Sequence, residues 1–243
     1  MEPGVKYILE AGVKAECDIQ LITRALVIYH NFMRCIGDVH YDPAMVAAAA
    51  LRLSSKTEEK ELDIDGLVFL FYHMVHGSVD TLYPEGMKFD VLKKSLITVE
   101  YIMQRMLEFT LKYNIAHQFL VPFLNVLLPR TQHIDGFLES MSTTCMKFMS
   151  DFYTSRMCLN YKPEDIAIAC IDTALHYHGF VEHLKMFHPW HEGFSVDLSE
   201  EKVKEMRRNI LMLYKHQIKA RLSADMEKLL SSFLEEECSP EKE

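Results

Sequence analysis

The stretch "YDPAMVAAAA", residues 41–50, places a proline behind an aspartate and then runs into four consecutive alanines. The stretch "YKPEDIAIAC", residues 161–170, repeats this opening 120 residues later. Proline suits the first position of a helix, because the N–H group that it lacks would have no partner there. We therefore predict that one helix begins at Pro43, with Asp42 as its cap, and that another begins at Pro163.

The match between the two halves continues on both sides of the prolines at the same offset. Matching positions upstream are Thr23, Ala25, Leu26 and Phe32 against Thr143, Cys145, Met146 and Phe152. A match at one fixed offset indicates an internal duplication of a helical unit. Small residues at 47–50 and at 167, 169 and 170 let helix backbones approach closely, so we expect both proline-led helices to be buried among other helices.

The composition is that of an ordinary globular protein, with 49% hydrophobic and 25% charged residues among 243. Only nine glycines and eight prolines interrupt long segments rich in Leu, Ala, Met, Glu and Lys, which predicts an all-α fold. Apolar residues spaced three and four apart predict helices near residues 6–15, 19–36, 43–54, 63–76, 89–109, 117–128, 134–156, 163–178, 181–187, 199–218 and 223–236. We expect Pro122 to kink or restart the helix at 117–128.

These helices group into two tandem repeats of five, preceded by one additional N-terminal helix. The predicted boundaries are an N-terminal helix at 1–16, a first repeat at 17–128, a linker at 129–133, a second repeat at 134–236 and an acidic tail at 237–243.

Charge and hydropathy disfavour several classes of partner. The net charge is −9 and Lys and Arg never run beyond a pair, so we expect no direct contact with nucleic acid. No stretch has the eighteen apolar residues of a membrane span, and the start lacks the apolar core of a secretory signal. We therefore expect no membrane partner and an intracellular location, nuclear, cytoplasmic or both.

Enzyme signatures such as GxxxxGK[ST], GxGxxG, GxSxG and HExxH are absent, so we predict no catalytic residues, no small-molecule substrate and no cofactor. One cluster raises an alternative, a metal-dependent helical enzyme, and it consists of His176, His178, His183, His188, His191 and Glu192. His176 and His178 lie two apart on a helix and do not share a face. We therefore predict that no metal binds.

Two five-helix units with an alanine-rich helix in the first resemble the cyclin fold. "LSSKTEE", residues 53–59, resembles the lysine that cyclins carry here, followed two and three residues later by glutamates. "VEYIMQRMLEFTL", residues 99–111, resembles the family's pattern of a glutamate followed by a Leu-x-Phe ending. In the second half, "CLNYKPEDIAIACIDTAL" at 158–175 and "HPWHEGFSVDLSEEKVKEM" at 188–206 look like segments of transcription-type cyclins. The resemblance covers roughly residues 5–218.

The resemblance implies a non-catalytic regulatory subunit. Such a protein binds a cyclin-dependent protein kinase and activates it by holding the kinase αC helix in its active position. "YILEAGVKAE", residues 7–16, and "IYHNF", residues 28–32, look most like the cyclin-Q subfamily, also called cyclin M. That subfamily implies a kinase like cyclin-dependent kinase ten as the partner.

The kinase-binding residues that the resemblance implies centre on Lys56 and Glu100. Lys56 can donate to backbone carbonyls of the kinase and Glu100 can accept from a backbone N–H. Residues expected around the pair are Leu53, Thr57, Glu58, Gln104 and Leu111. Thr57 and Gln104 stand where cyclins usually carry apolar residues, so the patch is more polar than is typical. The alternative for Lys56 and Glu100 is an internal ion pair without a binding role.

The segment "TRALVIYH", residues 23–30, partly resembles the substrate-docking helix of cell-cycle cyclins, through Arg24, Ala25 and Leu26. His30 occupies the place of that motif's tryptophan. Two rival functions share the fold. One is a promoter-binding transcription factor, which should carry a basic face. The other is a helical adaptor that binds another protein in the groove between its repeats.

Overall fold

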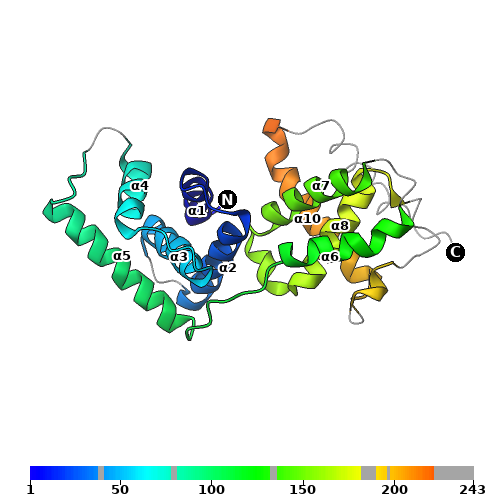
Figure 1. Ribbon diagram of the computed structural model, residues 1–243, viewed down its shortest axis with the longest axis horizontal. Helices are drawn as coiled ribbons and strands as arrows, with labels where there is room; N and C mark the ends of the chain where they lie inside the picture. Colours follow the sequence, from blue (N-terminus) through cyan, green and yellow to red (C-terminus); the bar gives the residue numbers. More distant parts are fainter. Residues whose placement is uncertain (38–40, 78–80, 132–135, 182–189, 196–197, 222–243) are drawn as a thin grey trace. The chain divides into compact units, whose positions relative to one another are not determined.

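The computed structural model describes residues 1–37, 41–77, 81–131, 136–181, 190–195 and 198–221. Every regular element in these ranges is a helix, as predicted (Figure 1). None of the helices in the described ranges is both long enough and apolar enough to cross a bilayer. The cysteines in this part of the chain carry free thiols.

The chain divides into two compact units. The first unit comprises residues 1–115 together with 153–160. Its elements are α1 (Pro3–Lys14), α2 (Ile19–Ile36), α3 (Pro43–Thr57), α4 (Ile64–His76), α5 (Met87–Met106) and the 3-10 helix η2 (Arg156–Asn160).

Helix α3 is the centre of the first unit, in contact with α1, α2, α4 and α5 (Figure 1). It begins at Pro43 as predicted, and the Asp42 carboxylate accepts a hydrogen bond from the Ala44 N–H at 3.0 Å. The side chains of Ala47 and Ala49 are fully buried. A methyl group in place of a larger side chain allows the surrounding helices to pack directly on the backbone of α3. The alanine row therefore marks burial, as the sequence predicts.

The second unit comprises the described residues of 116–152 and those from 161 onward. Its elements are α6 (His117–Leu127), α7 (Phe137–Phe152), α8 (Pro163–Tyr177), α10 (Glu200–Arg221) and the 3-10 helices η1 (Leu128–Arg130) and η4 (Trp190–Gly193). Helix α8 begins at Pro163 and packs against α6, α7 and α10. It has the central position here that α3 has in the first unit.

Buried carboxylates on α8 bind cations of α10. Asp165 pairs with Lys202 at 2.9 Å, and Asp172 pairs with Arg207 at 3.0 Å. Both carboxylates are largely buried, so these pairs fix the register between the two helices.

The division into units differs from the predicted repeat boundaries in one respect. Residues 116–128 were assigned to the first repeat, yet α6 packs against α7 and α8 and belongs to the second unit. The expected additional N-terminal helix is α1, and it packs against α2, α3 and α4 as an integral part of the first unit. Contacts rather than chain order decide this division. The repeat boundaries at 17–128 and 134–236 stay predictions.

Some helix expectations need correction. Helix α6 runs through Pro122 as one helix and does not restart. The carbonyl that loses its hydrogen bond belongs to Gln118, which is exposed, so water can serve it. Helix α5 ends at Met106 rather than 109. Most of the helices expected at 181–187 and 223–236, and the tail at 237–243, lie outside the described residues.

The burial of α3 predicts an overpacking penalty. We expect Ala49→Leu to lower the free energy of unfolding by about 1–3 kcal/mol, because this side chain is fully buried among packed helices. Urea unfolding measures the change. Val91→Leu, at an exposed position on α5, is the control and should change stability by less than about 0.5 kcal/mol. Equal stabilities for the two variants would contradict the packing described here.

The buried His30 predicts a pH dependence of stability. Its Nε2 lies 3.1 Å from the Tyr153 carbonyl, and burial lowers the pKa of the imidazole. The unfolded chain therefore binds more protons than the folded chain below about pH 6.5, so stability falls as the pH drops through that range. We expect wild type to lose more stability between pH 7.5 and 5.5 than His30→Gln, measured by urea unfolding. An identical loss in both would refute this assignment.

Candidate functional site

A network of four charged side chains joins the C-terminal half of α3 to α5. Glu100 comes from α5, and its two carboxylate oxygens pair with different cations of α3, Oε1 with Lys56 and Oε2 with Arg52. Arg52 and Lys56 lie four residues apart and so share one face of the helix. The other terminal nitrogen of Arg52 binds Glu61, with Nη2 and Oε1 2.9 Å apart.

The members of the network differ sharply in exposure. The Glu100 side chain is 4% exposed and that of Arg52 is 13% exposed, whereas Lys56 is 35% exposed. An ammonium group has three N–H donors, and the bond to Glu100 accounts for one of them. The internal ion pair that was one alternative for Lys56 and Glu100 is therefore present, and Lys56 still reaches solvent.

The other expected site residues of α3 fall into two environments. Leu53 is 1% exposed and packs in the core, so it does not form an exposed contact surface. Thr57 is half-buried, and its hydroxyl donates to the Ser54 carbonyl at 2.8 Å. The Glu58 carboxylate pairs with Arg24 of α2, which ties the C-terminal end of α3 to its neighbour.

Large exposed side chains lie at the C-terminal end of α5. Tyr101 is 63% exposed and Phe109 is 70% exposed, while Gln104 and Leu111 are half-buried. Gln104 lies one turn beyond Glu100, on the same side of the helix. The Phe109 N–H donates to the Gln104 carbonyl at 2.8 Å. Phe109 belongs to the Leu-x-Phe ending of the family pattern, but that pattern does not predict its exposure.

The backbone after α5 adopts an unusual conformation. Glu108 and Phe109 have φ values of 51° and 59°, in the left-handed region that side chains with a Cβ rarely adopt. An aromatic residue that is both exposed and held in this conformation is costly to the isolated protein. Such a feature is typical of a binding surface.

Two residues of this region were missed by the sequence analysis. The four-residue spacing from Arg52 to Lys56 was visible, but only the tertiary structure shows that both reach Glu100. Tyr101 follows Glu100 directly in the sequence. No sequence pattern indicates that Tyr101 is exposed while Glu100 is buried.

The expected docking helix is not available for docking. Arg24 is 5% exposed, Ala25 is fully buried and Leu26 is 1% exposed. Besides pairing with Glu58, Arg24 donates from Nε to the Tyr113 carbonyl at 3.1 Å. These side chains hold α2 within the first unit, which corrects the expectation of a docking surface here.

The described part of the histidine cluster lies in the second unit. His178 lies 2.8 Å from the Thr144 hydroxyl through Nε2, and burial lowers the pKa of its imidazole. His191 is 3% exposed, and among the residues that the structure describes neither of its ring nitrogens has a hydrogen-bond partner. His183 and His188 lie outside the described residues. Within the described ranges, no three His, Cys, Asp or Glu side chains converge as metal ligands.

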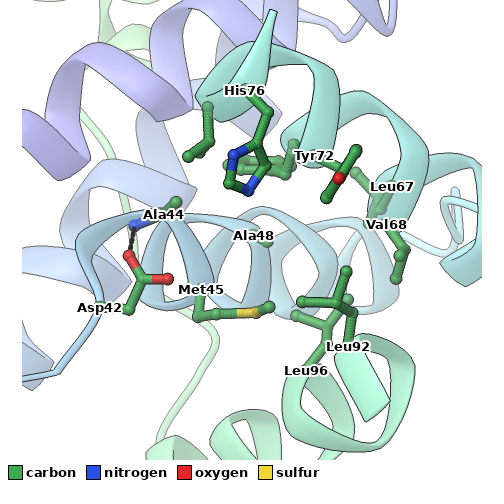
Figure 2. Close-up of a pocket in the computed structure, with 12 residues that line it drawn as sticks. Asp42, Ala44, Met45, Ala48, Leu67, Val68, Tyr72, His76, Leu92 and Leu96 are labelled. Carbon is green, nitrogen blue, oxygen red and sulfur yellow. Dashed lines mark hydrogen bonds between the residues drawn. The ribbon is translucent and has the colours of Figure 1, made fainter. Parts of the chain in front are cut away.

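A small cavity lies between α3, α4 and α5 (Figure 2). Its volume is about 60 Å³, and most of its lining is apolar, with Met45, Leu67 and Leu96 among the residues drawn. The cavity touches the first half of α3, near the cap formed by Asp42 and Ala44 (Figure 2). The charge network occupies the other half of α3, so the two features are distinct.

Because Glu100 is buried and Lys56 is partly exposed, we predict that substituting these two residues changes the free energy of unfolding by different amounts. Glu100→Leu leaves the largely buried guanidinium of Arg52, which is 13% exposed, without the Glu100 carboxylate, and we expect the free energy of unfolding to fall by about 3 kcal/mol. Lys56→Met leaves Glu100 paired with Arg52, and we expect a loss below about 1 kcal/mol. Denaturant unfolding of both variants measures the difference. Equal losses would show that Arg52 does not hold Glu100.

Comparison with known proteins agrees with the predicted fold. No family model matches the chain. The chain is 24% identical over 213 residues to Cyclin-L1 of Danio rerio, covering 87% of this chain and 41% of that protein. It is 25% identical over 216 residues to Cyclin-L2 of Homo sapiens, covering 87% of this chain and 39% of that protein. The chain thus spans about two fifths of the length of these relatives.

A solved structure shares the fold. The crystal structure of the yeast RNA Pol II CTD kinase CTDK-1 complex contains a chain that matches with a TM-score of 0.70 at 14% identity. The match covers 98% of this chain and 75% of that one. The chain therefore shares the all-helical fold of this solved chain, and most of its length is similar in sequence to proteins named cyclin-L.

Proposed function

We propose that this chain is the non-catalytic regulatory subunit of a cyclin-dependent protein kinase, which it binds and activates. The observation that carries the proposal is the ammonium of Lys56, which reaches solvent at the end of α3 while buried Glu100 holds it in place. Both residues stand at the positions of the cyclin pattern noted above. The face that we assign to the kinase consists of Lys56, Thr57, Tyr101, Gln104, Phe109 and Leu111, supported from beneath by Leu53, Glu58 and Glu100.

Activation follows from preferential binding to one kinase conformation. A protein kinase needs the ion pair between its β3 lysine and its αC glutamate, and αC must be positioned inward for the pair to form. A subunit that binds only the inward state stabilises it. Changing the ratio of inward to outward states from 1:99 to 99:1 requires about 5.5 kcal/mol of differential affinity.

One hydrogen-bonding lysine cannot supply that energy, so the aromatic side chains near it matter. Tyr101 and Phe109 are both largely exposed in the free chain. A fully buried aromatic side chain removes about 150–250 Å² from water. We infer that these two rings supply most of the apolar contact with the kinase. We also infer that Lys56 fixes the position of the kinase on this face.

We further propose that the kinase resembles cyclin-dependent kinase ten. Support comes from the resemblance of residues 7–16 and 28–32 to the cyclin-Q subfamily. The relatives reported above bear the name cyclin-L, and the kinase-binding face itself does not discriminate between these subfamilies.

Affinity capture tests the proposal directly. Tagged wild-type chain, expressed in its own cells, should capture a cyclin-dependent kinase that phosphorylates an added peptide. Lys56→Ala should capture much less, because the acceptors that Lys56 would bind remain unpaired. Arg34→Ala is the control, since Arg34 is exposed on α2 and bonds only Asn31 among the contacts described. A wild-type chain that captures no kinase would overturn the proposal and favour the adaptor function.

A gain-of-affinity variant provides an independent test. Gln104 is half-buried on the side of α5 that carries Glu100, where cyclins usually have leucine. We expect Gln104→Leu to strengthen binding of the captured kinase a few-fold, because it adds apolar contact surface. Titration of labelled kinase measures the dissociation constant. Weaker binding by this variant would place the interface elsewhere.

A further inference from the structure

We propose that Arg52 is a positioning residue that keeps Glu100 from neutralising Lys56, so that this face offers hydrogen-bond donors and selects an acceptor on the partner. The inference rests on the proposed function for the identity of the partner. The arrangement of charges can be tested on the free chain alone.

Glu100 is not free to contact a partner. Its side chain is 4% exposed, and Lys56 and Arg52 each occupy one of its oxygens. Each carboxylate oxygen can accept a second hydrogen bond, but the low exposure of Glu100 means that neighbouring side chains must move before a backbone N–H of a kinase can reach it. We therefore infer that Glu100 acts mainly through Lys56.

Arg52 changes the charge that Lys56 presents. A lysine and a glutamate alone sum to zero, whereas Arg52, Lys56 and Glu100 together sum to +1. Glu61 also touches Arg52, but it is 59% exposed and water screens much of its charge. Since the Lys56 side chain is 35% exposed and that of Arg52 only 13%, the surplus positive charge is most accessible to a partner at Lys56.

Arginine is suited to this place by its shape. Its Nη1 binds Glu100 and its Nη2 binds Glu61, so the planar fork spans two carboxylates. A lysine ammonium concentrates its donors at one point and cannot bridge them in the same way. The fork thus directs one oxygen of Glu100 toward Arg52 and leaves the other for Lys56.

The partner chemistry follows from this arrangement. Lys56 has N–H donors beyond the one given to Glu100, and the exposed carboxylate of the network, Glu61, pairs with Arg52. The matching partner element carries backbone carbonyls, as at a helix C-terminus, or a carboxylate. Measuring the affinity at increasing salt concentration distinguishes a carboxylate from backbone carbonyls, because affinity for a carboxylate falls more steeply with ionic strength.

The first experiment uses the free chain and does not depend on any kinase. NMR relaxation of the Lys56 ammonium reports how tightly Glu100 holds it. Removing Arg52 in Arg52→Leu leaves Glu100 with a single cation, so we expect the Lys56 ammonium to become more rigid. Arg52→Lys should lie closer to wild type, and Arg34→Leu, the matched control on α2, should not differ. An unchanged or more mobile Lys56 in Arg52→Leu would overturn the inference.

The second experiment measures binding to purified cyclin-dependent kinase ten. We expect Arg52→Leu to bind about tenfold more weakly, although Arg52 does not touch the kinase. In a Lys56→Met background, Arg52→Leu should cause no further loss, because its effect passes through Lys56. Additive losses in the double variant would overturn the inference. Wild-type chain that binds no kinase would instead overturn the proposed function, and the relaxation result would stand.

The same variants are checked for native folding. Far-ultraviolet circular dichroism and urea unfolding confirm that each variant is native. If Arg52→Leu does not fold, Arg52→Gln replaces it, since glutamine keeps a donor beside Glu100 without the charge. The expected rigidity of Lys56 and the expected loss of affinity are the same for Arg52→Gln, and their absence would count equally against the inference.

Discussion

The close packing of helices around α3 is the constraint on which the rest of the first unit depends. Ala47 and Ala49 have no exposed surface, and four helices contact α3. A helix enclosed in this way cannot shift without creating cavities or clashes. Its C-terminal end is therefore a rigid support, and α5 passes beside it closely enough for Glu100 to reach two of its side chains.

The charge network lies at this rigid end of α3 and defines which charges reach the surface there. Buried Glu100 requires cations, because an unpaired carboxylate in the protein interior is costly. Arg52 and Lys56 satisfy it together, and their unequal exposure makes the lysine the more accessible of the two cations. Nearby, Tyr101 and Phe109 expose aromatic area that the isolated chain does not bury. A polar anchor of fixed position beside exposed aromatic rings is suited to recognition of another protein.

Several features were predictable from sequence because local physics decides them. Pro43 and Pro163 begin helices since proline fits only the first turn, and Asp42 caps the first as expected. The spacing of apolar residues predicts most helices among the described residues to within a few positions. Other features depend on distant contacts. Leu53, Arg24 and Leu26 are buried by neighbouring helices, and α6 joins the second unit through its contacts with α7 and α8.

The sequence by itself determined the all-helical class and the duplicated proline-led helix, because propensity, capping and periodicity act over a few neighbouring residues. The roles of Lys56 and Glu100 came from the resemblance to cyclins and stay predictions. Only the tertiary structure decided that Arg52 shares Glu100 with Lys56, since residues 48 positions apart meet through the packing of α3 on α5. It also decided that Arg24 faces inward to Glu58 while Phe109 faces outward. Burial is a property of the assembled helices, and no single helix contains the information that sets it.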